Sequence, residues 1–165
     1  KLLANTLNCE LLNLGEKLRS SENTELIEIM KSGELVPDTF IFEIIESKIA
    51  SMAEDDFLVI DGFFRRDSEV RLLGEKQRAL DIEVGAIIDL RVSEEVVRPR
   101  LQKRARLDDD EKGVTNRLTV FRKERESVLA AAMEEGVRVV EVNGELTIDE
   151  VANEVDFKLK ELLSK

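Results

Sequence analysis

The sequence contains no histidine, tryptophan or tyrosine, and Cys9 is its single cysteine among 165 residues. Without histidine, the chain lacks the commonest metal ligand and the side chain most often used for proton transfer. One cysteine excludes a disulfide within the chain, which fits a reducing compartment. No apolar run reaches transmembrane length and no signal peptide is visible, so we expect a cytoplasmic protein with no membrane partner.

Positive charge is also scarce, because 25 lysines and arginines face 36 aspartates and glutamates, for a net charge of −11. Such an acidic chain does not favour nucleic acid or an anionic membrane as a partner. A site for a polyanion must therefore be a local cluster of arginines. The length suits a single domain with its own core, which we place at residues 1–165 and expect to be a monomer.

What the sequence does contain is an alternation of apolar and amphipathic segments. Strands are expected at 9–14, 56–63, 85–92 and 137–142. Helices are expected at 24–32, 38–51, 67–80, 93–105, about 114–135 and 147–164, with Gly33 and Gly136 as stops and Thr147 as a cap. Buried strands separated by helices indicate an α/β fold, a parallel sheet with helices on both faces in three layers.

The first candidate site is the stretch VIDGFFRR at 59–66, which ends one of the buried strands. Ligands of such folds bind at the carboxyl ends of the strands. Gly62 allows close approach to a ligand, Arg65 matches phosphate geometry, and Asp61 suits a hydrated magnesium ion. The alternative is a loop glycine, a helix-capping aspartate and two solvated arginines. These eight residues alone do not separate the two interpretations.

A second cluster lies in RPRLQKRARLDDDEKGVTNRL at 98–118. It contains Arg100, Arg104, Arg106 and Arg117, beside Asp108 and Asp109. Arg100 and Arg104 are four residues apart and share a helix face. A salt-bridged helical hairpin is the alternative for any one of these arginines. Four cations near one helix junction in an acidic chain favour a polyanion site instead.

Four segments, in order, resemble the adenylate kinases and related nucleoside monophosphate kinases. GELVPD (33–38) is similar to the monophosphate-site segment, DGFFRR (61–66) to an Asp-Gly-Phe-Pro-Arg motif, RLQKRARLDDDEKGVTNRL (100–118) to the lid flanks, and VNGELTIDEV (142–151) to the adenine loop. The resemblance covers nearly the whole chain. It implies a P-loop-kinase-like fold and Mg²⁺-dependent transfer of the terminal phosphoryl group of ATP to AMP. Another acceptor (GMP, CMP or UMP) is the alternative.

The resemblance also implies roles for individual residues. The monophosphate site would use Gly15, Arg19, Val36, Gly62, Arg65 and Glu69. The ATP site would use Arg100, Arg104, Gly144 and Ile148. The catalytic arginines would be Arg65, Arg104, Arg106 and Arg117, and Asp61 would reach the metal through water. A monophosphate-binding arm would span about 15–52, and a vestigial lid about 104–110, closed by Asp108 and Asp109.

Several departures from the family pattern bear on activity. The sequence has no G-x-x-x-x-G-K-[ST] phosphate loop, and it lacks the opening strand that is central in the family's sheet, between 56–61 and 84–91. We expect about twenty further residues upstream that carry this start. A protein truly without the loop would be a catalytically inactive nucleotide-binding relative. Only Ala105 separates Arg104 from Arg106, and a zinc-binding lid is excluded because its cysteines are absent.

Two further departures concern the acceptor. Phe64 stands where the family motif has proline, and Glu69 stands where members selective for AMP have glutamine. An ionised glutamate only accepts hydrogen bonds, so it suits guanine or cytosine better than the N1 and N6 edge of adenine. The alternative is that Glu69 points into solvent.

Overall fold

The computed structural model describes residues 1–53, 56–104 and 110–163. Its helices are α1 Leu2–Thr6, α2 Leu14–Arg19, α3 Thr24–Ser32, α4 Asp38–Ile49, α5 Asp67–Leu80, α6 Glu94–Arg104, α7 Glu111–Glu134 and α8 Ile148–Leu163. Its strands are β1 Glu10–Asn13, β2 Leu58–Asp61, β3 Ile87–Arg91 and β4 Val139–Asn143. The predicted alternation of strands and helices is confirmed.

The strands form two parallel pairs, β1 with β2 and β3 with β4. Asn13 lies opposite Asp61 in the first pair, and Arg91 lies opposite Asn143 in the second. In the described part of the chain β2 and β3 are not hydrogen-bonded to each other. This is the arrangement that the resemblance implies, because the family's central strand would lie between these two.

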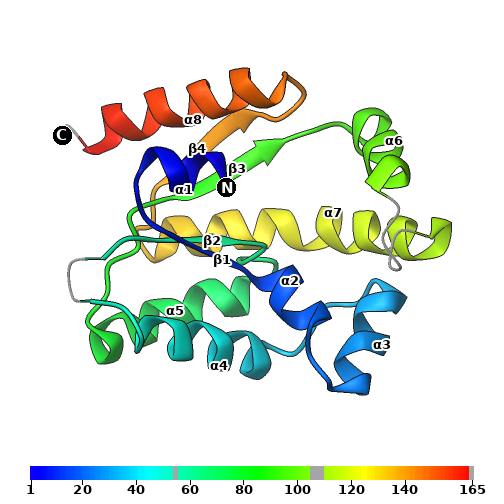
Figure 1. Ribbon diagram of the computed structural model, residues 1–165, viewed down its shortest axis with the longest axis horizontal. Helices are drawn as coiled ribbons and strands as arrows, with labels where there is room; N and C mark the ends of the chain where they lie inside the picture. Colours follow the sequence, from blue (N-terminus) through cyan, green and yellow to red (C-terminus); the bar gives the residue numbers. More distant parts are fainter. Residues whose placement is uncertain (54–55, 105–109, 164–165) are drawn as a thin grey trace.

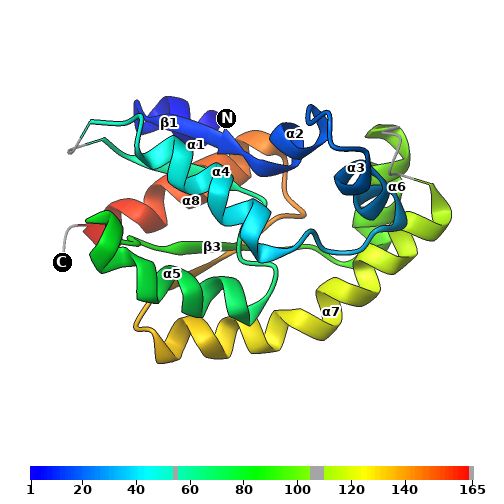
Figure 2. The same cartoon turned by 90° about the horizontal axis from the view of Figure 1, so that it is seen from below.

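Helices cover the strands on two sides, as predicted for three layers (Figure 1). On one side α8 packs against β4 and α1 packs against α8, through a cluster that includes Val142, Val155 and Leu159. On the other side α5 and α7 pack on β3 and β4, and α4 packs on β1 and β2. Viewed from below, α4 and α5 lie in front of the strands (Figure 2). The α/β fold is thus confirmed.

One local prediction is wrong, since the strand expected at 9–14 ends at Asn13 and Leu14 begins the helix α2. The side chain of Asn13 accepts a hydrogen bond of 2.9 Å from the backbone N–H of Glu16, which is the contact of an N-cap. Helix α7 likewise begins at Glu111, earlier than expected, because the Asp110 carboxylate accepts from the N–H of Gly113. Side-chain caps therefore determine where α2 and α7 begin.

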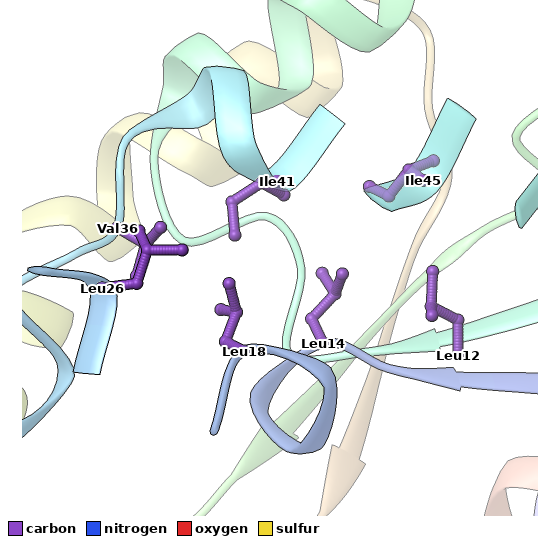
Figure 3. Close-up of a cluster of buried hydrophobic side chains, with 7 residues drawn as sticks. All are labelled: Leu12, Leu14, Leu18, Leu26, Val36, Ile41 and Ile45. Atoms are coloured by element: carbon purple, nitrogen blue, oxygen red, sulfur yellow. The ribbon is translucent and has the colours of Figure 1, made fainter. Parts of the chain in front are cut away.

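The hydrophobic cluster between β1 and α4 also holds α2 and α3 in place. Its buried members are Leu12, Leu14, Leu18, Leu26, Val36, Ile41 and Ile45, and their side chains converge between the helices (Figure 3). Ile45 and Leu14 are buried almost completely. The segment of about 15–52 therefore has apolar anchors of its own against β1 and β2.

None of the helices in the described residues is both long enough and apolar enough to cross a membrane.

Candidate functional site

The carboxyl ends of β1 and β2 carry two paired polar side chains. Asn13 Nδ2 donates to Asp61 Oδ2 at 2.9 Å, and both residues end their strands at the same level. The Asp61 carboxylate is exposed at this edge. The prediction that Asp61 lies at the end of a strand, where ligands of such folds bind, is confirmed.

The loop after β2 wraps the side chain of Arg65 around Gly62. Gly62 has φ +87°, a left-handed conformation that glycine adopts without strain, and Arg65 Nε donates to its carbonyl oxygen at 3.0 Å. A Cβ at position 62 would lie 3.1 Å from Arg65 Nη2. Glycine therefore allows the guanidinium to pack directly on the backbone of the loop.

Two of the other predicted arginines lie close enough to Arg65 to influence its pKa. Desolvation lowers the pKa of Arg65, the negative charges of Glu69 and Asp61 raise it, and the positive charges of Arg117 and Arg19 lower it. Arg65 nevertheless keeps an exposed surface, so that an anion has access to it. Cations from α2, from the loop and from α7 thus converge near Asp61.

Gly15 supports this arrangement from the first turn of α2. A Cβ at Gly15 would lie 3.2 Å from Arg19 Nη1, so the Arg19 guanidinium folds back over the helix start. The two predicted acceptor-site residues are thereby neighbours in space.

The segment 33–38 begins beside Arg117. Gly33 ends α3 with φ +78°, and a Cβ there would lie 2.7 Å from the carbonyl oxygen of Gly113 and 3.3 Å from Arg117 Cγ. Asn116 Nδ2 donates to the carbonyl oxygen of Ser32 at 2.9 Å. The end of α3 is therefore fixed against the start of α7.

Glu69 is buried, with 3% of the residue exposed, so the alternative in which it points into solvent is wrong. Its Oε2 accepts from the backbone N–H of Arg65 at 2.6 Å. Burial raises the pKa of Glu69 and Asp38 adds to the rise, whereas the N–H groups of Arg65 and Arg66 and the charge of Arg65 lower it. The carboxylate therefore braces the loop from the first turn of α5.

Phe64 adopts φ +55°, an uncommon conformation for a residue with a side chain. Its ring stacks on Phe63 with centroids 4.3 Å apart, and Phe63 meets Phe42 of α4 edge to face. Proline is locked near φ −65° and cannot adopt this conformation. A proline at position 64 would therefore not fit the backbone of this loop.

Arg66 is the residue of this region that the sequence did not single out. Its guanidinium lies against the backbone of segment 33–38, and the residue is only partly exposed. The only feature of the sequence that could have pointed to Arg66 was its pairing with Arg65, and two successive arginines are common on exposed surfaces.

Two of the predicted ATP residues, Arg100 and Gly144, are in contact just beyond the carboxyl ends of β3 and β4. Arg100 of α6 donates to the carbonyl oxygens of Gly144 and Glu145, at 2.6 Å and 3.1 Å. Ile148 is 76% exposed at the start of α8, and Arg104 is exposed at the end of α6. Arg106, Asp108 and Asp109, with most of the expected lid, lie outside the described residues.

The described residues hold no group of three or more acidic or cysteine side chains that would bind a metal ion directly. Asp61 has one oxygen on Asn13 and an exposed carboxylate, so it fits contact with a metal-bound water.

The chain is similar to known proteins over most of its length. A family model described as adenylate kinase matches residues 4–137. An adenylate kinase of Nautilia profundicola is 34% identical over 89% of this chain and 80% of its own length. One of Campylobacter hominis is 35% identical over 86% of this chain and 74% of its own, and adenylate kinase 1 of Synechocystis is 29% identical over 96% and 87%.

Proposed function

The chain belongs to the adenylate kinase family, and from that premise we propose that it transfers the terminal phosphoryl group of ATP to AMP, giving two molecules of ADP. One observation carries the proposal. Arg65, in the loop after β2, has the positive charges of Arg19 of α2 and Arg117 of α7 near it, and the Arg117 side chain lies beside Gly33. Such a cluster suits an acceptor phosphate and a moving phosphoryl group.

The chemistry needs positioning and charge stabilisation more than proton transfer. Phosphoryl transfer requires two nucleotides held in line while negative charge on the moving group is neutralised. Fixed arginines supply this stabilisation without reorganising during the reaction. We assign Arg19 and Arg65 to the acceptor phosphate and Arg65, Arg104, Arg106 and Arg117 to the transferred group. The absence of histidine is then no obstacle.

For the nucleotide bases, we assign the backbone of Val36 and the region of Gly62 and Glu69 to the acceptor. Arg100, Gly144 and Ile148 are assigned to the donor adenine. The contact of Arg100 with the carbonyl oxygen of Gly144 supports a shared donor site, because it joins two of the three.

Magnesium is the cofactor that this chemistry would use, because it would neutralise negative charge on the donor phosphates. We propose that Asp61 would hold the ion through its water shell. Asn13 orients the Asp61 carboxylate by its hydrogen bond. We also propose that the protein acts as a cytoplasmic monomer, with an acceptor arm at about 15–52 and a short lid at about 104–110.

The alternative is a catalytically inactive nucleotide-binding protein. A kinase of this type needs backbone amides and a lysine around the donor phosphates, so a protein without a phosphate loop would bind nucleotide and form no product.

Coupled measurement of ADP formation from ATP and AMP, with and without Mg²⁺, tests the proposal. GMP, CMP and UMP as acceptors test the base. ADP formation with AMP supports the adenylate kinase, and formation with another monophosphate alone changes the acceptor. Nucleotide binding without product from any acceptor favours the inactive protein.

A further inference from the structure

Arg66 makes an unusually complete set of contacts for a residue at a helix end. It is the N-cap of α5, with an extended backbone at φ −133° and ψ 154°, and its side chain crosses to the segment before α4. Nη1 donates to the carbonyl oxygen of Val36 at 2.9 Å and to Asp38 Oδ1 at 2.8 Å. Nη2 donates to the carbonyl oxygen of Leu35 at 3.0 Å. One guanidinium therefore holds two successive carbonyl groups and a carboxylate.

The carboxylate partner is itself fixed from the same side. Ser68 Oγ donates to Asp38 Oδ2 at 2.5 Å, so Asp38 is held by two residues of the α5 start. The side chains of Arg66 and Asp38 are 29% and 23% exposed, well below the exposure of the surface ion pair of Arg71 with Glu134 at 46% and 60%. Water screens such a partly buried pair less than it screens a surface pair. The planar guanidinium also matches this fork of acceptors, which a lysine cannot do.

Arg66 makes these contacts with the Leu35–Val36 backbone, which the proposed function assigns to the acceptor base. The Val36 side chain is buried in the core of the acceptor arm, while its backbone carbonyl oxygen accepts from Arg66. The neighbour of Arg66 in the chain is Arg65, which lies in the arginine cluster. Arg66 thus joins the backbone assigned to the acceptor base to the residue assigned to the acceptor phosphate.

We propose that Arg66 is a positioning residue that holds the Leu35–Val36 backbone at a fixed distance from Arg65, so that acceptor base and acceptor phosphate are bound together. This inference rests on the proposed function for its acceptor nucleotide. The Val36 carbonyl oxygen keeps a second lone pair for a donor on the base, because Arg66 occupies one of two. Binding of the acceptor, and not of ATP, depends on the clamp.

The experiment compares Arg66→Ala, Arg66→Lys and Arg71→Ala in the full-length protein. Arg71 is the control, since it lies on α5 and makes its ion pairs with Glu134 and Asp67 away from segment 33–38. Steady-state kinetics give KM for AMP, KM for ATP and kcat. Arg66→Ala is expected to raise KM for AMP roughly tenfold, as for loss of hydrogen bonds to a charged group, with KM for ATP and kcat changed less than about threefold. Arg66→Lys should recover part of the loss, and Arg71→Ala should match the parent.

Amide hydrogen exchange of peptides covering 33–40 gives a readout that needs no activity. Exchange should speed up in Arg66→Ala and not in Arg71→Ala. Unchanged exchange overturns the clamp. Faster exchange with an unchanged KM for AMP overturns the positioning role, and a fall in kcat alone places Arg66 at the transferred group instead. If the parent protein phosphorylates no nucleoside monophosphate, the proposed function fails and the positioning role with it, while exchange still decides whether the clamp exists.

Discussion

The acceptor half of the site and the donor half are built in different ways. The acceptor half, segment 33–38 with loop 62–66, rests on a buried core and on the interior contacts of Glu69 and Arg66. The donor half is exposed, since α6 buries none of its residues and Ile148 is 76% exposed. The same fold thus offers a preorganised surface to one nucleotide and an open one to the other. Substitutions of buried residues should change stability and binding together in the first half, whereas substitutions in the second should change binding alone.

The largest effect is expected for Arg65→Ala. Loss of a charge partner of the moving phosphoryl group commonly costs about 3–4 kcal/mol, so kcat should fall by two to three orders of magnitude. The free energy of unfolding should change little, because the guanidinium retains solvent access. Steady-state kinetics and urea unfolding test both expectations, with Arg71→Ala as control. Turnover near that of the parent would remove Arg65 from the catalytic group.

The acceptor half also shows where sequence-based prediction succeeds and where it fails. The run Asp61–Gly62 after an apolar strand predicted the site edge, because parallel strands bring their carboxyl ends together. Arg65 and Arg117 followed from the family motifs. The contacts of Arg66 and the hydrogen bond from the Arg65 N–H to Glu69 could not be predicted from the sequence. A side chain that bonds to backbone carbonyl or N–H groups leaves no periodic pattern in the sequence.

The fold was predictable for a different reason. Apolar runs and helix stops such as Gly33 act locally, so the helices at Thr24–Ser32 and Asp67–Leu80 were predicted at their observed bounds. The errors lie where one side chain decides a boundary. Asn13 caps α2 and shortens the strand before it, and no hydrophobic pattern encodes that choice.

Glu69→Gln tests whether the buried carboxylate reads the acceptor base. Glutamine keeps an oxygen that can accept from the Arg65 N–H, and it adds N–H donors that can reach adenine. The ratio of kcat/KM for AMP to kcat/KM for GMP or CMP should therefore rise, by a factor that corresponds to about 1–2 kcal/mol. The four monophosphates are compared in both forms, with exposed Glu75→Gln on the same helix as control. Unchanged ratios would leave Glu69 with its bracing role only.

The same substitution should change how stability depends on pH. The pKa of Glu69 is raised above its ordinary value of 4.5, chiefly by burial and further by Asp38, against the opposing effects of the Arg65 and Arg66 N–H groups and the Arg65 charge. The folded state therefore holds this proton more tightly than the unfolded state, and stability falls as pH rises from 4.5 through the raised pKa. In Glu69→Gln this loss is absent, so the variant should gain on the parent across that window. Urea unfolding of both forms from pH 4 upwards, at roughly half-unit steps within the titration range of carboxyl groups, measures the difference. A difference that is constant with pH would contradict it.

Ile45→Val probes the core beneath the acceptor half. Ile45 is 0% exposed, and removal of one buried methylene group typically costs about 0.5–1.5 kcal/mol. The midpoint of urea unfolding should fall accordingly, and KM for AMP should rise slightly because segment 33–38 packs on the same core. KM for ATP should stay constant. An equal rise in both KM values would show that the two halves are coupled more tightly than their contacts suggest.

Ile148→Ala is the counterpart in the donor half, and its expected effect is the smallest. A side chain that is 76% exposed contributes little to folding, so the unfolding midpoint should not move. If bound adenine covers Ile148, truncation removes a few apolar contacts from the complex alone. KM for ATP should then rise about two- to fivefold, which corresponds to less than about 1 kcal/mol, with KM for AMP unchanged.

Met133→Ala is the matched control, because Met133 is 78% exposed on α7 and no nucleotide role is assigned to it. An unchanged KM for ATP would place the adenine elsewhere. A lower unfolding midpoint would show that the donor half, too, carries part of the stability of the fold.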